Sequence, residues 1–211
     1  MVYGSFQRVG IVPVVVINDA KKAASLADAL CEGGLPCAEV TFRTSAASES
    51  IRIMRDRHPE MLVGAGTVLS EDQADEALRA GAQFIVSPGI ESGLVRHCKD
   101  IGITVIPGTQ TPSDMMLAVR LGLEVVKFFP AEPSGGLGML KALAAPFTSL
   151  RFMPTGGINA SNVGDYLAYD RIVACGGSWM VKSSLIDSDD FDSVRRLSVE
   201  AAEIVRHFRS I

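Results

Sequence analysis

Short apolar segments rich in β-branched residues recur along the whole chain, and amphipathic segments separate them. Continuous apolar runs of this kind are typical of parallel strands that are covered on both faces. Eight such runs can be counted, beginning at Val9 (VGIVPVVVI), Cys37 (CAEVTF), Leu62 (LVGAGTV), Phe84 (FIVSPG), Thr104 (TVIPGT), Val125 (VVKFFP), Arg151 (RFMPTGG) and Ile172 (IVACGGSW). The pattern predicts eight strands.

The segments between these runs carry apolar residues at helical spacing. The clearest predicted helices cover 19–32, 70–80, 113–121 and 189–207. Asp19, Ser70 and Ser113 stand where an N-cap residue would begin the first three of them. Strands that alternate with helices pair in parallel, and eight units favour a closed (β/α)8 TIM barrel. A doubly wound open sheet is the alternative, but the first run leads into VVVINDAKKAA, which lacks the GxGxxG turn of its dinucleotide-binding form.

Composition adds the domain count to this picture. The chain has 211 residues, 47% of them hydrophobic and 21% charged, as in an ordinary folded domain rather than a disordered chain. No Pro- or Ser-rich linker and no low-complexity segment divides it. We therefore expect a single barrel domain over residues 1–211.

Charge and cysteine content exclude several classes of protein. The formal net charge is −4 and no basic run occurs, which argues against a nucleic-acid partner. Cys31, Cys37, Cys98 and Cys175 form no CxxC pair and have no histidine at ligand spacing, so neither a disulfide framework nor a zinc site is indicated. The N-terminus lacks a signal-peptide pattern, and the apolar run over 9–17 is too short to span a bilayer. We expect a cytoplasmic protein with no membrane partner and no metal.

One lysine interrupts an apolar run. Period-2 alternation in VVKFFP places Val125, Lys127 and Phe129 on one face of the predicted strand and Val126 with Phe128 on the other. Burial disfavours an ammonium, and a neutral amine can attack a carbonyl carbon. Lys127 is therefore a candidate nucleophile. The alternative is a lysine at a strand end that reaches water or pairs with a carboxylate.

An acid and a guanidinium share one face at the end of the second run. In AEVTFRT the same alternation projects Glu39, Thr41 and Arg43 to one side. If Glu39 and Lys127 both point into the barrel mouth, the carboxylate can move protons while Arg43 holds a substrate carboxylate. A simple Glu39–Arg43 ion pair is the competing interpretation.

Glycines follow the last two predicted strands. Thr155, Gly156 and Gly157 come after the seventh, and the residues GGS at 176–178 come after the eighth. Barrels commonly bind phosphate at these two loops, where glycine lets backbone N–H groups approach an anion. Either pair alone would be ordinary turn chemistry. Together they predict a phosphate site.

Three other strand ends carry small or ring-constrained residues. Thr67, Pro88 and Thr109 end the third, fourth and fifth runs, where they could line a pocket. Turn chemistry is the default explanation for all three.

In this order, the strings EVTFRT, GAGTV, SPG, PGT, KFFPAE, PTGGI and GGSW resemble those of the 2-keto-3-deoxy-6-phosphogluconate aldolases, many of which also act on 4-hydroxy-2-oxoglutarate. The match runs nearly end to end. The resemblance implies a class I aldolase that uses no metal or other cofactor. Its substrate would be a small phosphorylated 2-oxo acid, 2-dehydro-3-deoxy-6-phospho-D-gluconate, cleaved to pyruvate and D-glyceraldehyde 3-phosphate. It also implies a homotrimer.

The resemblance also implies a role for each matching residue. Lys127 corresponds to the Schiff-base lysine, Glu39 to the general acid/base and Arg43 to the arginine that binds the pyruvate carboxylate. The remaining implied substrate-binding residues are Thr67 and Pro88 at the pyruvate pocket, Gly156, Gly157 and Ser178 at the phosphate, and Thr155 and Phe129, which shape the pocket.

Other functions stay open at this stage. The same mechanism could act on the galactonate epimer or on 4-hydroxy-2-oxoglutarate, which lacks a phosphate. A barrel that only binds a sugar phosphate, with Lys127 pairing with the charge of its ligand, is the alternative from another class. A metal-dependent aldolase is disfavoured because no cluster of His, Asp and Glu stands at the strand ends.

Overall fold

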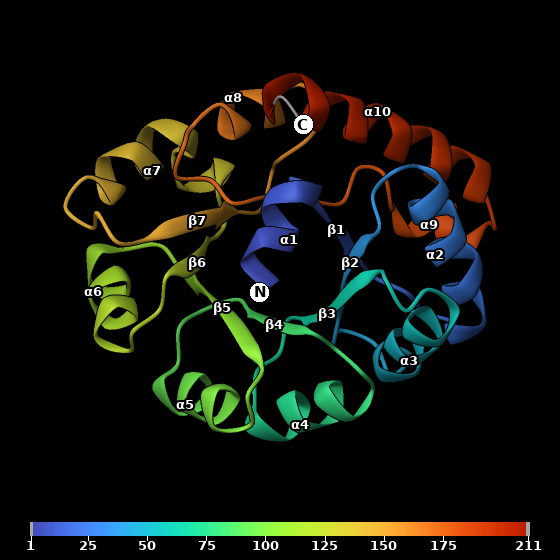
Figure 1. Ribbon diagram of the computed structural model, residues 1–211, viewed down its shortest axis with the longest axis horizontal. Coiled ribbons are helices and arrows are strands. Elements are labelled where there is room, and N and C mark those ends of the chain that lie inside the picture. Colours follow the sequence, from blue (N-terminus) through green and yellow to red (C-terminus); the bar gives the residue numbers. More distant parts are fainter. Residues whose placement is uncertain (1, 210–211) are drawn as a thin grey trace.

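Eight parallel strands form a ring with helices around it in the computed structural model, which describes residues 2–209 (Figure 1). Hydrogen bonding joins the strands in the order β7-β6-β5-β4-β3-β2-β1-β8. Parallel bridges between Phe152 and Ile172 and between Thr155 and Gly176 connect the two ends of this order. The predicted (β/α)8 barrel is therefore confirmed, and the open sheet is wrong.

The eight predicted runs each contain one strand, and a helix or helical turn follows each. The strands are β1 (Ile11–Val15), β2 (Cys37–Thr41), β3 (Leu62–Gly66), β4 (Phe84–Ser87), β5 (Thr104–Thr109), β6 (Val125–Phe128), β7 (Arg151–Pro154) and β8 (Cys175–Gly177). The helices are α1 (Val2–Val9), α2 (Ala23–Glu32), α3 (Ala47–Arg57), α4 (Glu71–Arg79), α5 (Ser92–Asp100), α6 (Pro112–Arg120), α7 (Gly136–Ala144), α8 (Val163–Leu167), α9 (Ser183–Asp187) and α10 (Phe191–Arg209), with 3-10 turns η1 (Ala20–Lys22) and η2 (Glu132–Ser134).

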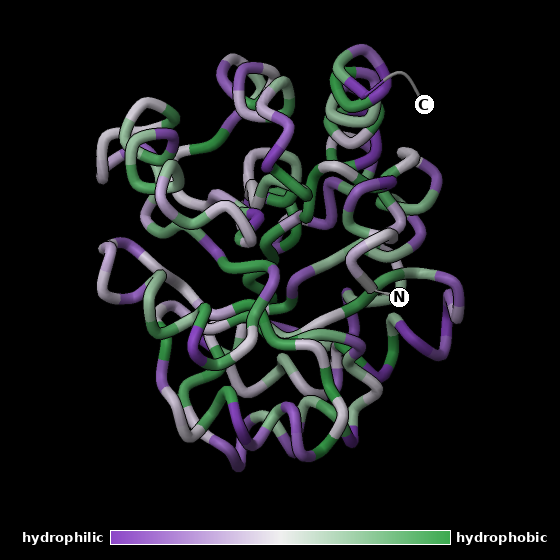
Figure 2. Tube along the Cα trace, turned by 60° about the vertical axis from the view of Figure 1, so that its left-hand side comes forward, coloured by the Kyte–Doolittle hydropathy of each residue, from purple (hydrophilic) through white to green (hydrophobic). Residues whose placement is uncertain are grey.

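Side-chain alternation along the strands creates two separate apolar regions. In β6, Val126 and Phe128 pack with the helices in the larger cluster, whereas Val125 belongs to a smaller cluster inside the ring. In β2, Cys37 faces inward while Ala38 and Val40 face the helices. Hydrophobic segments accordingly run through the middle of the molecule and hydrophilic ones lie mostly at its periphery (Figure 2). Lys127 and Glu39, each two residues from an inward-facing neighbour, point into the barrel.

An N-terminal helix that the strand pattern did not predict fills one end of the ring (Figure 1). Helix α1 places Phe6, which is fully buried, edge-to-face against the Phe84 ring with 4.9 Å between centroids. Phe84 lies at the start of β4, so this contact closes the N-terminal end of the barrel. The opposite end, where barrels carry their active sites, is left for polar residues.

The helix starts follow the capping residues closely, with one correction. The Asp19 side chain accepts from Lys21 N, and that of Ser70 accepts from Gln73 N, as expected for N-caps. Ser113 is not a cap. Thr111 is the N-cap of α6 instead, in a reciprocal capping box with Asp114, and Pro112 occupies the first helical position, for which proline is well suited.

Among residues 2–209, none of the helices combines the length and the apolar character that a bilayer crossing requires.

Candidate active site

Lys127 and Glu39 meet inside the barrel. Lys127 Nζ lies 3.6 Å from Glu39 Oε1, and the two residues are 6% and 1% exposed. Strand β6 supplies the lysine and β2 the glutamate, so their proximity comes from closure of the ring rather than from the sequence. Within the described residues Glu39 forms its ion pair with Lys127, not with Arg43. The alternative of a Glu39–Arg43 pair is therefore wrong.

The buried pair is poorly satisfied by the rest of the protein. Neither carboxylate oxygen of Glu39 has a hydrogen-bond partner among residues 2–209. Lys127 Nζ lies 4.8 Å from the centroid of the Phe129 ring, over its face. Buried polar groups normally find partners, so those without one are candidates for contact with a ligand. Thr155 Oγ1, directly after β7, is also buried without a hydrogen-bond partner among the described residues.

A cavity of about 190 Å³ lies next to Phe129, the ring that Lys127 Nζ faces, although neither Lys127 nor Glu39 is part of its lining. It brings together the two glycine turns that the sequence marked as a phosphate site. Its lining consists of Val14, Val16, Arg43, Phe129, Thr155, Gly156, Gly157, Ile158, Gly176, Gly177 and Ser178. Gly156 and Gly157 have φ values of +100° and +81°, a backbone conformation that glycine adopts readily. Arg43 adds the one side-chain cation of the lining, which suits an anionic ligand.

Besides Lys127 and Glu39, two predicted substrate-binding residues lie outside this lining. Thr67 follows β3 with φ of +56°, and Pro88 follows β4. Both stand at the same end of the barrel as Lys127, since all strands run in parallel. Pro88 also contacts the strand next to the lysine: a Cβ on Gly108, the residue paired with Lys127, would lie 2.0 Å from the Pro88 oxygen.

The model of the family described as KDPG and KHG aldolase matches residues 3–197 of this chain. The chain belongs to that aldolase family.

Named members of the family match along nearly their whole length. The 2-dehydro-3-deoxy-phosphogluconate aldolase of Treponema pallidum is 46% identical over 204 residues, which is 97% of each chain. The KHG/KDPG aldolase of Escherichia coli K12 is 44% identical over 193 residues, 92% of this chain and 91% of that one. A solved KDPG aldolase from Legionella pneumophila holds pyruvate captured at low pH as a covalent carbinolamine intermediate. It matches this chain with a TM-score of 0.90 at 35% identity, and the match covers 94% of this chain and 97% of that one.

Two glycines make room for the polar groups of this aldolase-family site. A Cβ on Gly66 would lie 2.3 Å from Glu39 Oε1, and one on Gly176 would lie 2.3 Å from Thr155 Oγ1. Neither distance is possible for real atoms, so a larger residue at either position would force the polar side chain to move. The sequence analysis explained GAGT as a turn, but Gly66 is the last residue of β3, and its missing side chain leaves room for the Glu39 carboxylate on the neighbouring strand. That role is visible only once β2 and β3 are paired, Thr41 opposite Gly66.

The cavity also contains residues that the sequence analysis did not single out. Val14 and Val16 form one wall, although they read as ordinary members of an apolar run. Gly176 and Gly177 belong to β8 itself rather than to the loop after it. Only Ser178 of the GGS string follows the strand. The apolar wall could be found from the sequence only by knowing which strands β1 pairs with, namely β2 and β8.

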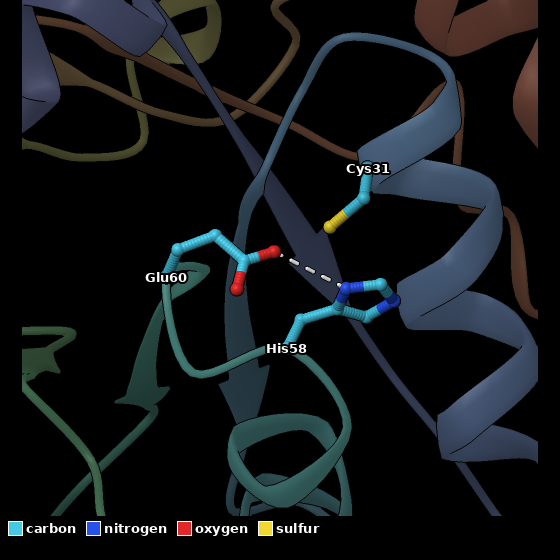
Figure 3. Close-up of side chains that lie close together, drawn as sticks. All are labelled: Cys31, His58 and Glu60. Atoms are coloured by element: carbon cyan, nitrogen blue, oxygen red, sulfur yellow. Dashed lines mark hydrogen bonds and ion pairs between the residues drawn. The ribbon is translucent and has the colours of Figure 1, made fainter.

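A second group of ligand-type side chains lies at the other end of the barrel. Donor atoms of Cys31, His58 and Glu60 all lie within 4.8 Å of one another (Figure 3). His58 Nδ1 is 3.2 Å from Glu60 Oε1, and its Nε2 is 2.6 Å from Asp28 Oδ1. Arg57 also pairs with Asp28. Both ring nitrogens thus have carboxylate partners, and the group belongs to a hydrogen-bonded network between the C-terminal parts of α2 and α3.

Proposed function

We propose that this aldolase cleaves 2-dehydro-3-deoxy-6-phospho-D-gluconate to pyruvate and D-glyceraldehyde 3-phosphate through a Schiff base on Lys127. The observation that carries the proposal is a buried lysine whose Nζ lies 3.6 Å from a buried carboxylate oxygen, at the end of a barrel where such enzymes have their active sites. Membership in the family and the named relatives support the substrate.

The chemistry needs a nucleophile and one proton carrier. Lys127 first gives one ammonium proton to Glu39, and the neutral amine adds to the C2 ketone. Glu39 returns that proton to the carbinolamine hydroxyl, which leaves as water, and the product is an iminium. Glu39 takes the proton of the C4 hydroxyl as the C3–C4 bond breaks, and the bonding electrons move into the iminium to form an enamine. D-Glyceraldehyde 3-phosphate departs. Glu39 then returns the proton to C3, and water hydrolyses the new iminium to release pyruvate and the free amine.

The remaining site residues bind and orient the substrate in this proposal. The guanidinium of Arg43 receives the substrate carboxylate, for which its planar fork is suited. Thr67 and Pro88 border the pyruvate end. Gly156, Gly157 and Ser178 receive the phosphate, and Thr155 with Phe129 shapes the space between the two ends. Fixing both ends of the substrate holds C2 near Lys127, which lowers the entropic part of the barrier.

Borohydride trapping tests the central claim. Incubation with pyruvate and sodium borohydride is expected to add the mass of one reduced pyruvate to the wild-type protein, and Lys127→Ala is expected to show none. Circular dichroism and thermal melting establish that the variant is folded. Activity should be unchanged by EDTA. A folded wild-type protein that forms no adduct, or an adduct that persists in Lys127→Ala, would refute the proposal.

Cleavage of 4-hydroxy-2-oxoglutarate to pyruvate and glyoxylate is a second candidate activity. The E. coli relative that matches 92% of this chain is named for both substrates, and the smaller substrate has no phosphate for the glycine turns to bind. Comparison of kcat/KM for the two substrates and for the galactonate epimer ranks the three. Equal or greater efficiency without the phosphate would reverse the order proposed here.

We also propose that the enzyme assembles as a homotrimer. Exposed apolar side chains support an interface between subunits, since Met116 and Val119 on α6 and Met139 on α7 are 56%, 44% and 45% exposed. Light scattering coupled to size-exclusion chromatography is expected to give three times the mass of one chain. A monomeric or dimeric mass at micromolar concentration would contradict the assembly without affecting the chemistry.

A further inference from the structure

The string KFFPAE ends in a glutamate for which the Schiff-base chemistry has no use. Glu132 begins η2, just beyond the strand that carries Lys127. It lies outside the cavity lining and outside the Lys127–Glu39 pair. Its position nevertheless connects two parts of the site, the β6 strand end and the glycine turn after β7.

Glu132 supports that glycine turn from behind. Its backbone N donates to Gly156 O at 3.0 Å, next to a bond of 2.8 Å from Ala131 N to Thr155 O. Its side chain packs directly against Gly157: a Cβ on Gly157 would lie only 2.5 Å from Glu132 Cβ. The turn that lines the cavity therefore rests on both the backbone and the side chain of Glu132.

A buried phenol fixes the direction of the Glu132 side chain. The Tyr166 hydroxyl, on α8, donates to Glu132 Oε1, and Tyr166 is 2% exposed. Burial, and after it the hydrogen bond to Glu132, raises the pKa of Tyr166, so the phenol stays a donor throughout the neutral range. Gly136 leaves room for the contact, because a Cβ there would lie 3.1 Å from Glu132 Oε1.

We propose that Glu132 and Tyr166 are positioning residues that hold the Gly156–Gly157 turn in the shape that binds the substrate phosphate. This inference rests on the proposed function. Neither side chain lines the cavity, so both act through the turn. The turn can present its N–H groups to an anion only while its backbone is held, and the Tyr166–Glu132 hydrogen bond is the part of that support which a side-chain substitution can remove.

The consequence is selective for the phosphate end of the substrate. Loss of the hydrogen bond releases the carboxylate of Glu132 without moving Lys127, Glu39 or Arg43. Binding of a phosphorylated ligand should weaken, whereas reaction of Lys127 with pyruvate, which has no phosphate, should not change. If the hydrogen bond served stability alone, its loss would lower the melting temperature and leave the affinity for phosphate unchanged.

Tyr166→Phe is the decisive variant because it removes one hydroxyl and little volume. The expected result is a rise of roughly threefold to tenfold in KM for the phosphorylated substrate and in Ki for inorganic phosphate, the range of one ordinary intramolecular hydrogen bond, with kcat nearly unchanged. The rate of reduced pyruvate adduct formation should equal that of the wild type. Tyr169→Phe is the matched control, since Tyr169 contacts Lys141 and not Glu132.

Variants of the partner complete the test. Glu132→Gln keeps an acceptor oxygen and should behave nearly as the wild type, whereas Glu132→Ala should reproduce the Tyr166→Phe defect. The double variant should be no worse than Glu132→Ala alone, since both remove the same interaction. Equal shifts in phosphate Ki and in adduct formation, or an unchanged phosphate Ki, would overturn the inference. Failure of the wild type to form an adduct would instead refute the proposed function.

Discussion

The two ends of the barrel interior are built from the same strands but have opposite contents. At the N-terminal end, Phe6, Phe84 and Val125 form a closed apolar layer. One side-chain step further along β6, Lys127 faces Glu39, whose oxygens have no hydrogen-bond partner among the described residues. A buried ion pair gains little net stability, because desolvation offsets the attraction between the charges. The apolar end therefore stabilises the barrel, while the other end is shaped for a ligand.

The largest effect is expected from replacing the polar pair itself. Lys127→Met combined with Glu39→Leu should reduce turnover by at least on the order of 10⁴-fold, because both the nucleophile and the proton carrier are lost. The free energy of unfolding should stay the same or rise by about 1–4 kcal/mol, since a desolvated pair is removed. Denaturant titration and steady-state assays measure the two quantities. Lys21→Met, on the exposed η1, is the control, and a marked loss of stability in the double variant would contradict the comparison.

The opposite substitution tests the apolar end. Phe84→Ala should lower the free energy of unfolding by about 3–5 kcal/mol, because it removes a fully buried ring that Phe6 and Gly64 contact. At temperatures where the variant is folded, borohydride should still trap pyruvate on it. Urea unfolding gives the stability. A folded variant unable to form the adduct would show that the two ends are not independent.

Gly66 offers a change at the polar end that leaves every reacting group in place. The methyl group of Gly66→Ala would lie 2.3 Å from the present position of Glu39 Oε1, which is too close for two atoms in contact, so the carboxylate must shift. Misplacement of a catalytic group by about 1 Å costs roughly 10²-fold in rate, and we expect a fall of that order in kcat. Gly89→Ala is the matched control, because its Cβ would meet nothing within 4 Å. A Gly66→Ala enzyme with normal kcat would mean that the position of Glu39 is not critical.

The smallest effect belongs to the helices outside both ends. On α5, His97 Nε2 lies 2.8 Å from Asp75 Oδ1 on α4. That hydrogen bond, with the nearby charges of Glu71 and Asp100, raises the pKa of His97. A raised pKa in the folded state means that the contribution to stability is complete below the ordinary histidine pKa of about 6.5 and is lost as the pH rises through the folded value.

His97→Gln measures that contribution. The difference in melting temperature between wild type and variant should be larger at pH 5.5 than at pH 9. The aldolase activity of the variant should equal that of the wild type, because the pair is on the outer surface. A difference that is the same at both pH values would show that the ion pair adds nothing to stability.

Prediction from the sequence worked where one local pattern carried the answer. Period-2 alternation in an apolar run indicated that Lys127 faces the interior, and it is buried in the structure. For Glu39 the alternation gave the face of the strand, and the structure shows that this face points to Lys127. Prediction of the N-cap residue was correct at Asp19 and Ser70 and wrong at Ser113. There Pro112 takes the first helical position, so the preceding Thr111 is the N-cap. Helix α1 was missed because it is only eight residues long and precedes the first strand, and because its position depends on contact with the distant Phe84.

What the sequence determined by itself is the alternation of strands and helices and the face on which each candidate side chain lies, since both follow from local backbone geometry. Tertiary structure alone decided which of these side chains meet. Pairing of Lys127 with Glu39, the space that Gly66 leaves for it, and the support that Tyr166 gives to the glycine turn all join segments far apart in the chain. The physical reason is that ring closure and register bring atoms together through space, and no local pattern encodes those distances.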